Sequence, residues 1–221
     1  MLASRHPAAM PDPGLKAALE LNGPEACLAY YRDWAARYDG GFAETMDYRL
    51  PAHVAAAYMS TGAQGPVLDV GAGTGLLAQS LREMGFAGEI DAADFSAEML
   101  ERAAGKGLYT HLAQADITRP LALPRRYAGL VSSGTFTAGH VGPEALPSLL
   151  DVALPGAQFA LSVNRRVWTA QGFDRAFDAL AAQGRITALQ IIEVQVYGPA
   201  ATTLDPDHAA DRAQVVLFRA A

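Results

Sequence analysis

The residues of this sequence best suited to chemistry are a glycine-rich stretch, VLDVGAGTG (67–75), and three aspartates that follow in order along the chain. Gly71 and Gly73 have no Cβ, so the backbone there can turn tightly and approach a ligand closely. Asp69 lies two residues before Gly71. A carboxylate at that position would repel a pyrophosphate, but it would attract the ammonium group of an amino-acid moiety. The loop also has Leu76 where dinucleotide-binding loops have their third glycine.

The other two aspartates are suited to the remaining parts of a nucleoside-like ligand. Asp94 ends the stretch EIDAAD, where its carboxylate can accept from the two hydroxyls of a ribose, and Phe95 can lie against an adenine face. Asp116 follows in LAQADIT, where it can accept from an exocyclic amine while Ile117 covers the ring. Each acid alone is more often a cap or turn residue. On successive strands, however, all three meet in one crevice, because ligands of open α/β sheets lie beyond the carboxyl ends of the strands.

The elements that must position these residues alternate between short apolar strands and helices after residue 65, as is typical of an α/β domain. We expect seven strands, at 66–70, 89–94, 110–114, 129–133, 158–164, 187–197 and 214–219, and helices at 76–84, 97–104, 143–153 and 169–183. The loop before the last strand is too short and too rich in Pro and Asp for a crossover helix, which predicts an antiparallel hairpin. The sequence therefore predicts a Rossmann-like, seven-stranded, mostly parallel sheet with a C-terminal antiparallel hairpin and helices on both faces.

The chain before the sheet is expected to have two parts. Residues 1–23 have several prolines and predict a flexible N-terminus, whereas residues 24–64 predict a helical lid segment with helices at 24–36 and 48–61. Tyr30, Trp34 and Tyr38 follow one another at helical spacing, and their segment either closes over a substrate or packs on the core. Residues 65–221 then form the ligand-binding domain.

The composition limits the partners. The 221 residues include 17 basic and 23 acidic side chains, with a formal net charge of -6, and the basic ones are scattered, so we expect no nucleic-acid partner. One cysteine allows no intrachain disulfide and no Cys-based zinc site, and the histidine spacing predicts no metal site. No run of apolar residues has the length of a signal peptide or membrane span, so we expect a cytoplasmic protein without a membrane partner. A homodimer stays open.

The order of the motifs VLDVGAGTG, ADFSAEML, QADIT, YAGLVSSGTF and LPGAQFALSVN resembles the class I S-adenosylmethionine (SAM) dependent methyltransferase superfamily over residues 24–221. The stretch YRDWAARYD is similar to the segment that precedes the cofactor domain in small-molecule members, and SSGTFTAGHVGPEAL resembles the Williams-Beuren-type methyltransferase-like proteins. The resemblance implies the class I methyltransferase fold, SAM as the cofactor, and methyl transfer to O, N or C of a small molecule.

The resemblance also implies particular cofactor contacts. It places Asp69 at the methionine amine, Asp94 on the ribose and Asp116 at the adenine edge. The complete expected set is Tyr38, Asp69, Gly71, Ala72, Gly73, Asp94, Phe95, Met99, Asp116, Ile117, Ser132 and Ser133, with Tyr38 at the carboxylate and the two serines facing the sulfonium. One departure is visible at 127–130, where this chain has YAGL and many members have an acid-containing FDLV.

The catalytic residue is harder to predict, because methyl transfer from a sulfonium depends on in-line positioning more than on acid or base chemistry. His140 is the first candidate for a general base and Tyr30 the second, although His140 could equally serve as a structural cap. Arg165, Arg166 and Trp168 either line the acceptor side or form a surface turn. Two other functions stay open, a SAM-binding module without transferase activity and a nicotinamide-dependent oxidoreductase; Asp69 and the terminal hairpin argue against the second.

Overall fold

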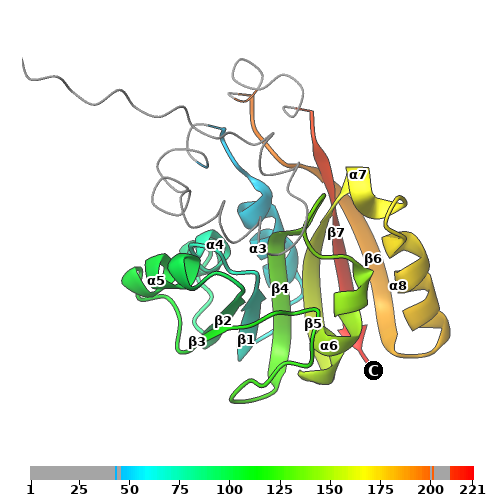
Figure 1. Cartoon of the computed structure of the whole chain (residues 1–221), viewed down its shortest axis with the longest axis horizontal. Coiled ribbons are helices and arrows are strands. Elements are labelled where there is room, and N and C mark those ends of the chain that lie inside the picture. The colour runs from blue at the N-terminus through cyan, green and yellow to red at the C-terminus, as the bar shows by residue number, and fades with distance from the viewer. Residues whose placement is uncertain (1–42, 44–45, 200, 202–209) are drawn as a thin grey trace, which may run out of the picture.

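One sheet organises the residues that the computed structural model describes, which are 43, 46–199, 201 and 210–221 (Figure 1). Its strands are β1 (Val67–Val70), β2 (Ile90–Asp94), β3 (Leu112–Gln114), β4 (Tyr127–Phe136), β5 (Ala153–Asn164), β6 (Ile186–Gln195) and β7 (Arg212–Ala220). The expected helix at 24–36 lies outside the described residues, as do Tyr30, Trp34 and Tyr38. The predicted number of strands is confirmed.

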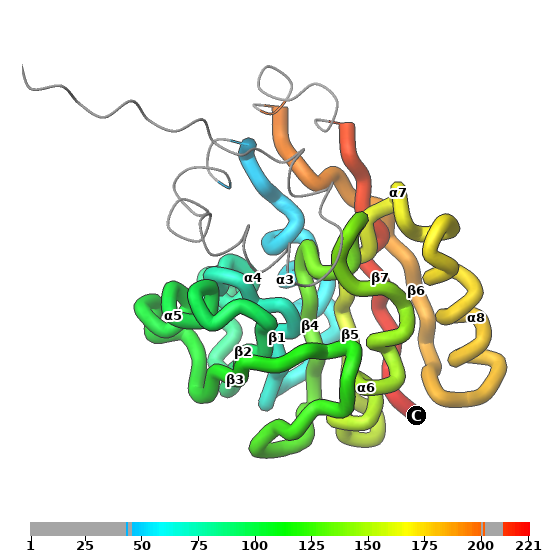
Figure 2. Tube along the Cα trace, in the orientation of Figure 1, coloured from blue at the N-terminus to red at the C-terminus, as the bar shows by residue number. Residues whose placement is uncertain are grey.

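The strand order is β3-β2-β1-β4-β5-β7-β6, so β3 and β6 form the two edges of the sheet (Figure 2). Strands β1 to β5 pair in parallel, whereas β7 is antiparallel to both β5 and β6. The predicted mostly parallel sheet with a C-terminal antiparallel hairpin is therefore confirmed. From β1 the chain proceeds to β2 and β3 on one side and later to β4 and β5 on the other. This reversal between β1 and β4 is the point at which open α/β sheets bind their ligands.

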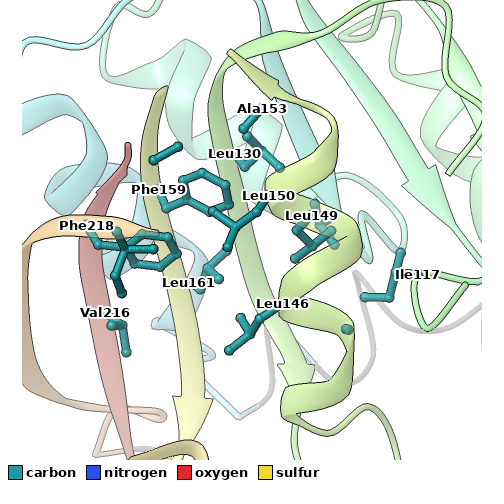
Figure 3. Packing of buried hydrophobic residues seen from close by; sticks show 14 of the residues in the cluster. Ile117, Leu130, Leu146, Leu149, Leu150, Ala153, Phe159, Leu161, Val216 and Phe218 are labelled. Carbon is teal, nitrogen blue, oxygen red and sulfur yellow. The ribbon is translucent and has the colours of Figure 1, made fainter. Parts of the chain in front are cut away.

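Helices cover both faces of the sheet. They are α3 (Leu50–Ser60), α4 (Leu76–Glu83), α5 (Ala97–Gly105), α6 (Leu146–Asp151), α7 (Arg165–Trp168) and α8 (Phe173–Ala182), with a 3-10 turn, η3, at Pro143–Ala145. On one face, apolar side chains of α3 and α4 pack with Val67 and Val131. On the other face, α6 packs with Phe159 and Phe218 (Figure 3). Apolar residues of α8 and Leu68 belong to the same cluster. Because successive strand residues point to opposite faces, the short apolar strand β1 is buried by both layers. None of the described helices has the length and apolar character needed to cross a membrane.

Two predicted helices were wrong in their bounds. The helix expected at 143–153 is a 3-10 turn followed by the short α6, and Ala153 pairs with Tyr127 as the first residue of β5. This pairing lengthens both β4 and β5, and the register shift that follows includes Gly156 at φ 77°. The helix expected at 169–183 starts only at Phe173, after Gly172 at φ 80°, and a separate short helix, α7, ends before it at Trp168.

Candidate functional site

The glycine loop joins β1 to α4 at the carboxyl edge of the sheet. Gly71, Gly73 and Gly75 have φ values of 65°, 54° and 91°, which L side chains rarely adopt. A Cβ on Gly71 would also clash with the Oγ1 atom of Thr135, whereas a Cβ on Gly73 would meet no atom of the described residues within 4 Å. The loop is therefore closely packed against β4 at Gly71 and open at Gly73, where a ligand can approach the backbone.

Two hydroxyl groups of β4 hold the end of β1 in place. Ser132 Oγ donates to the Val70 carbonyl oxygen at 2.8 Å, and Thr135 Oγ1 donates to the same oxygen at 3.1 Å. Ser132 is buried and Ser133 is half-buried at this edge. Sequence reasoning placed Ser132 and Ser133 at the site but missed Thr135, since only the fold shows that it lies against Gly71.

Asp94, at the end of β2, ties the glycine loop to the start of α5. Its Oδ2 accepts from the backbone N–H of Gly73 at 2.7 Å, and its Oδ1 accepts from Ser96 at 2.8 Å. Burial raises the pKa of Asp94, and the amides of Ser96 and Gly73 oppose that rise. Each carboxylate oxygen has a second lone pair, so Asp94 can still accept from ribose hydroxyls.

The residues after Asp94 divide into a ligand-facing candidate and a cap. Phe95 is 37% exposed, which leaves its ring available to a ligand. Ser96 accepts from the Met99 N–H at 3.2 Å, which confirms it as the N-cap of α5. Met99 lies on the buried face of α5, and Ala72 of the loop is buried beside Leu100.

Asp69 is the most unusual carboxylate at this edge. Its side chain is fully buried, and Tyr109 donates its hydroxyl to Oδ2 at 2.7 Å. No described residue donates a hydrogen bond to Oδ1. Burial raises the pKa of Asp69 to about 7; the nearby Asp94 charge adds to the rise, and the Tyr109 hydrogen bond and the backbone amide of Ala78 oppose it. Tyr109 was missed by sequence reasoning, because it lies 40 positions from Asp69 and belongs to no motif.

Asp116 and Ile117 follow β3. Asp116 accepts from the backbone N–H and the hydroxyl of Thr118, at 3.0 and 2.6 Å, and forms an ion pair with Arg119. The Thr118 hydrogen bond lowers the pKa of Asp116, so this carboxylate is ionised at neutral pH. Ile117 is buried in the cluster that includes Leu149 of α6 (Figure 3). The structure thus brings Asp69 and Asp94 together through the glycine loop, with Asp116 at the next strand end.

The candidates for the acceptor side differ in their contacts. His140 lies on the loop after β4, and burial lowers its pKa, so its imidazole is neutral at neutral pH. Arg165 and Arg166 of α7 instead form ion pairs with Glu193 and Asp211, at 3.1 and 2.6 Å. These pairs join α7 to the C-terminal hairpin region and favour the surface-turn interpretation of the two arginines. The ring of Trp168 stacks on that of Phe177, with their centroids 5.8 Å apart, where α7 packs on α8.

A second buried aspartate, Asp91 near the start of β2, lies in a complete polar network. Arg125 donates from Nε to Oδ2 at 2.9 Å and from Nη2 to Oδ1 at 3.1 Å, and the Tyr127 hydroxyl donates to Oδ2 at 3.0 Å. His111 Nδ1 lies 3.1 Å from Oδ1, and Glu89 also pairs with Arg125. This network joins β2 to the start of β4. In the described part of the chain no three His, Cys, Asp or Glu side chains are grouped to hold a metal ion.

Comparisons with known proteins find methyltransferases. The methyltransferase domain family matches residues 67–156. A human protein, methyltransferase-like protein 27, is 34% identical over 144 residues, which cover 62% of this chain and 57% of that protein. The chain thus spans little more than half the length of this curated relative.

Solved structures share the fold at low sequence identity. The N-methyltransferase NodS of Bradyrhizobium japonicum WM9, in complex with S-adenosyl-L-homocysteine (SAH), has a TM-score of 0.54 at 16% identity, covering 77% of this chain and 85% of its own. The DhpI–SAH complex has a TM-score of 0.58 at 21% identity, covering 86% and 93%. The fold and the site define a Rossmann-like domain of the methyltransferase type. The chain has the fold of class I SAM-dependent methyltransferases, and residues 67–156 and the human relative make it similar in sequence to a methyltransferase domain.

Proposed function

We propose that this protein binds SAM at the carboxyl edge of β1, β2 and β3 and transfers its methyl group to O, N or C of a small-molecule acceptor. In this proposal Asp69 faces the methionine ammonium, Asp94 holds the ribose, and Asp116 with Ile117 borders the adenine. The open backbone at Gly73 is suited to the methionine part of the cofactor.

The observation that carries the proposal is the incomplete hydrogen bonding of Asp69. A buried carboxylate is costly unless a cation or hydrogen-bond donors complete it. Asp69 has one side-chain donor, from Tyr109, with the backbone amide of Ala78 also acting on it, and no ion pair with a described residue, while Oδ1 has no hydrogen-bond donor among the described residues. A primary ammonium supplies both the missing charge and the missing donor. A pyrophosphate would add a negative charge beside Asp69 and Asp94, which disfavours a nicotinamide dinucleotide at this site.

The acceptor side requires little more than positioning. SAM carries its methyl group on a positively charged sulfur, and holding two reactants in line can remove roughly 7 to 11 kcal/mol of the barrier. A base is needed only where the acceptor must lose a proton. His140, neutral at neutral pH because burial lowers its pKa, is our candidate for that role.

Calorimetric titration with SAM, SAH and NADH tests the cofactor. We expect SAM and SAH to bind and NADH not to bind; tight binding of NADH alone would instead support an oxidoreductase. Asp94→Ala should weaken SAM by about 1 to 3 kcal/mol, roughly 5- to 150-fold, because ribose donors lose their acceptor. The control is Asp178→Ala, an exposed aspartate on α8 on the far part of the sheet, which should leave the affinity unchanged. Equal affinities in Asp94→Ala and the wild type would mean that the ribose lies elsewhere.

Turnover of SAM with a panel of small-molecule acceptors tests the transferase activity. We expect SAH to accumulate with at least one acceptor class and His140→Gln to reduce the rate only for acceptors that must lose a proton. If SAM binds but is not consumed with any acceptor of the panel, the result would favour a non-catalytic SAM-binding module.

A further inference from the structure

Tyr109 lies where three parts of the SAM site meet. It precedes β3, and its ring packs beside Ala72 of the glycine loop and Leu100 of α5. A Cβ on Gly75 would lie 3.1 Å from this ring, so the ring is in close contact with the end of the glycine loop. From this position the hydroxyl donates to Asp69 Oδ2 at 2.7 Å. One side chain therefore contacts both the loop and its buried acid.

The hydrogen bond makes the two oxygens of Asp69 unequal. Oδ2 is held by Tyr109, whereas Oδ1 is buried and accepts from no described donor. A carboxylate fixed through one oxygen cannot rotate freely, so the direction in which Oδ1 accepts is set before a ligand arrives. Such preorganisation by a supporting hydrogen bond is how binding sites keep a charged contact precise.

We propose that Tyr109 is a positioning residue, which fixes the Asp69 carboxylate so that Oδ1 is left to accept from the ammonium group of the cofactor's amino-acid moiety. This inference rests on the SAM site proposed above and assigns Tyr109 a role in selecting ligands that carry an ammonium group. Tyr109 acts through Asp69 and not on the transferred methyl group.

The proposal predicts a characteristic pH dependence. Within the described structure, the titratable groups acting on Asp69 are Tyr109, from the segment before β3, and Asp94, from β2; β4 contributes the uncharged Ser132 and Thr135. An ammonium binds the ionised carboxylate, and burial holds the pKa of Asp69 at about 7, so affinity should rise with pH across neutrality. The Tyr109 hydroxyl stabilises the ionised form. Without it the pKa of Asp69 rises further, and the increase in affinity moves to higher pH.

The test compares two ligands by calorimetry, from about pH 6 to about pH 8, a range that brackets the titration of Asp69. SAH carries the amino-acid moiety, and 5′-methylthioadenosine lacks it. We expect Tyr109→Phe to weaken SAH roughly tenfold at neutral pH and to shift the midpoint of its pH dependence upward by about one unit. Binding of 5′-methylthioadenosine should change little. The matched control is Tyr127→Phe, which removes a tyrosine-to-aspartate hydrogen bond from the Asp91 network and should change the binding of neither ligand.

Asp69→Asn keeps the shape of the side chain and provides a second variant. It should bind SAH weakly with no pH dependence and bind 5′-methylthioadenosine as the wild type does. Thermal unfolding of each variant without ligand checks that it is folded.

The outcomes separate this inference from the function on which it rests. Wild-type protein that binds neither ligand would contradict the SAM site itself. Wild-type protein that binds SAH, with Tyr109→Phe giving the same affinity and pH midpoint, would limit Tyr109 to a structural role. An equal loss for both ligands would show that Tyr109 shapes the glycine loop as a whole and would also overturn the proposal.

Discussion

Two buried aspartates one register position apart have opposite surroundings. Leu68 pairs with Asp91 and Asp69 pairs with Ala92 between the parallel strands β1 and β2, so the two carboxylates point to opposite faces of the sheet. Asp91 is 2% exposed and receives hydrogen bonds from Arg125 and Tyr127. Asp69 is fully buried, and in the part of the chain described it has the Tyr109 hydroxyl and the backbone amide of Ala78 beside it but no cation.

The two sets of surroundings distinguish an acid that stabilises the fold from an acid that is available to bind a ligand. A buried charge with its cation and donors in place contributes to the fold and has little capacity left for a ligand. A buried carboxylate without a cation is costly to the folded state, and natural proteins accept that cost mainly at functional sites. By this criterion Asp91 joins β2 to β4, whereas Asp69 fits the role that the proposed function gives it, as the acceptor of a cationic group.

The largest expected effect is on how stability depends on pH. The pKa of Asp69 rises from 3.8 to about 7 through burial, so between these values the folded protein keeps a proton that the unfolded chain has lost. The free energy of unfolding of the wild type should therefore fall as pH rises through this window. Asp69→Asn cannot ionise, so its stability relative to the wild type should increase by up to about 4 kcal/mol across the window.

Urea unfolding without ligand at several pH values measures this difference. The exposed Asp178→Asn is the control and should give a curve parallel to that of the wild type. If Asp69→Asn also runs parallel to the wild type, Asp69 is ionised in the folded protein in the ordinary way, and the contrast with Asp91 disappears.

The next effect concerns the complete network. Arg125→Met keeps an apolar chain of similar length but leaves Asp91 buried without its cation, so we expect a loss of about 3 kcal/mol in the free energy of unfolding. Urea unfolding at neutral pH measures the loss. Arg119→Met is the matched control, since Arg119 is 80% exposed in its ion pair with Asp116, and should change stability little. A similar small change in both variants would show that Arg125 does not stabilise Asp91.

Much of this fold could be predicted from the sequence, because the strands and the glycine loop are local patterns. Val67, Leu68 and Val70 mark a strand buried on both faces, and the run into Leu76 marks the start of a helix. The bounds of α6 were wrong because Ala153 pairs with Tyr127, a contact between positions far apart that outweighs the local helical pattern.

The site was predictable to the same degree. Asp69 and Asp94 precede or follow recognisable turns, so their spacing placed them at one edge of the sheet. Tyr109 and Thr135 have no sequence signal. Tyr109 reaches Asp69 only because β3, which follows it, pairs with β2, and Thr135 reaches Gly71 only because β4 pairs with β1. The different surroundings of Asp69 and Asp91 could not be predicted either, since they depend on which face of the sheet Arg125 lies on.

The smallest expected effect on stability comes from one hydroxyl group of the Asp91 network. Tyr127→Phe removes the donor to Asp91 Oδ2 but leaves Arg125 on both carboxylate oxygens, so we expect a loss of about 1.5 kcal/mol in the free energy of unfolding. Double-variant unfolding with Asp91→Asn measures the interaction, and the loss from Tyr127→Phe should shrink once the carboxylate is gone. An unchanged loss would place the contribution of Tyr127 in the packing of its ring against Leu68 and the surrounding core. Asp91 would then have its charge neutralised by Arg125 alone, and its surroundings would differ from those of Asp69 by a cation and not by a complete network.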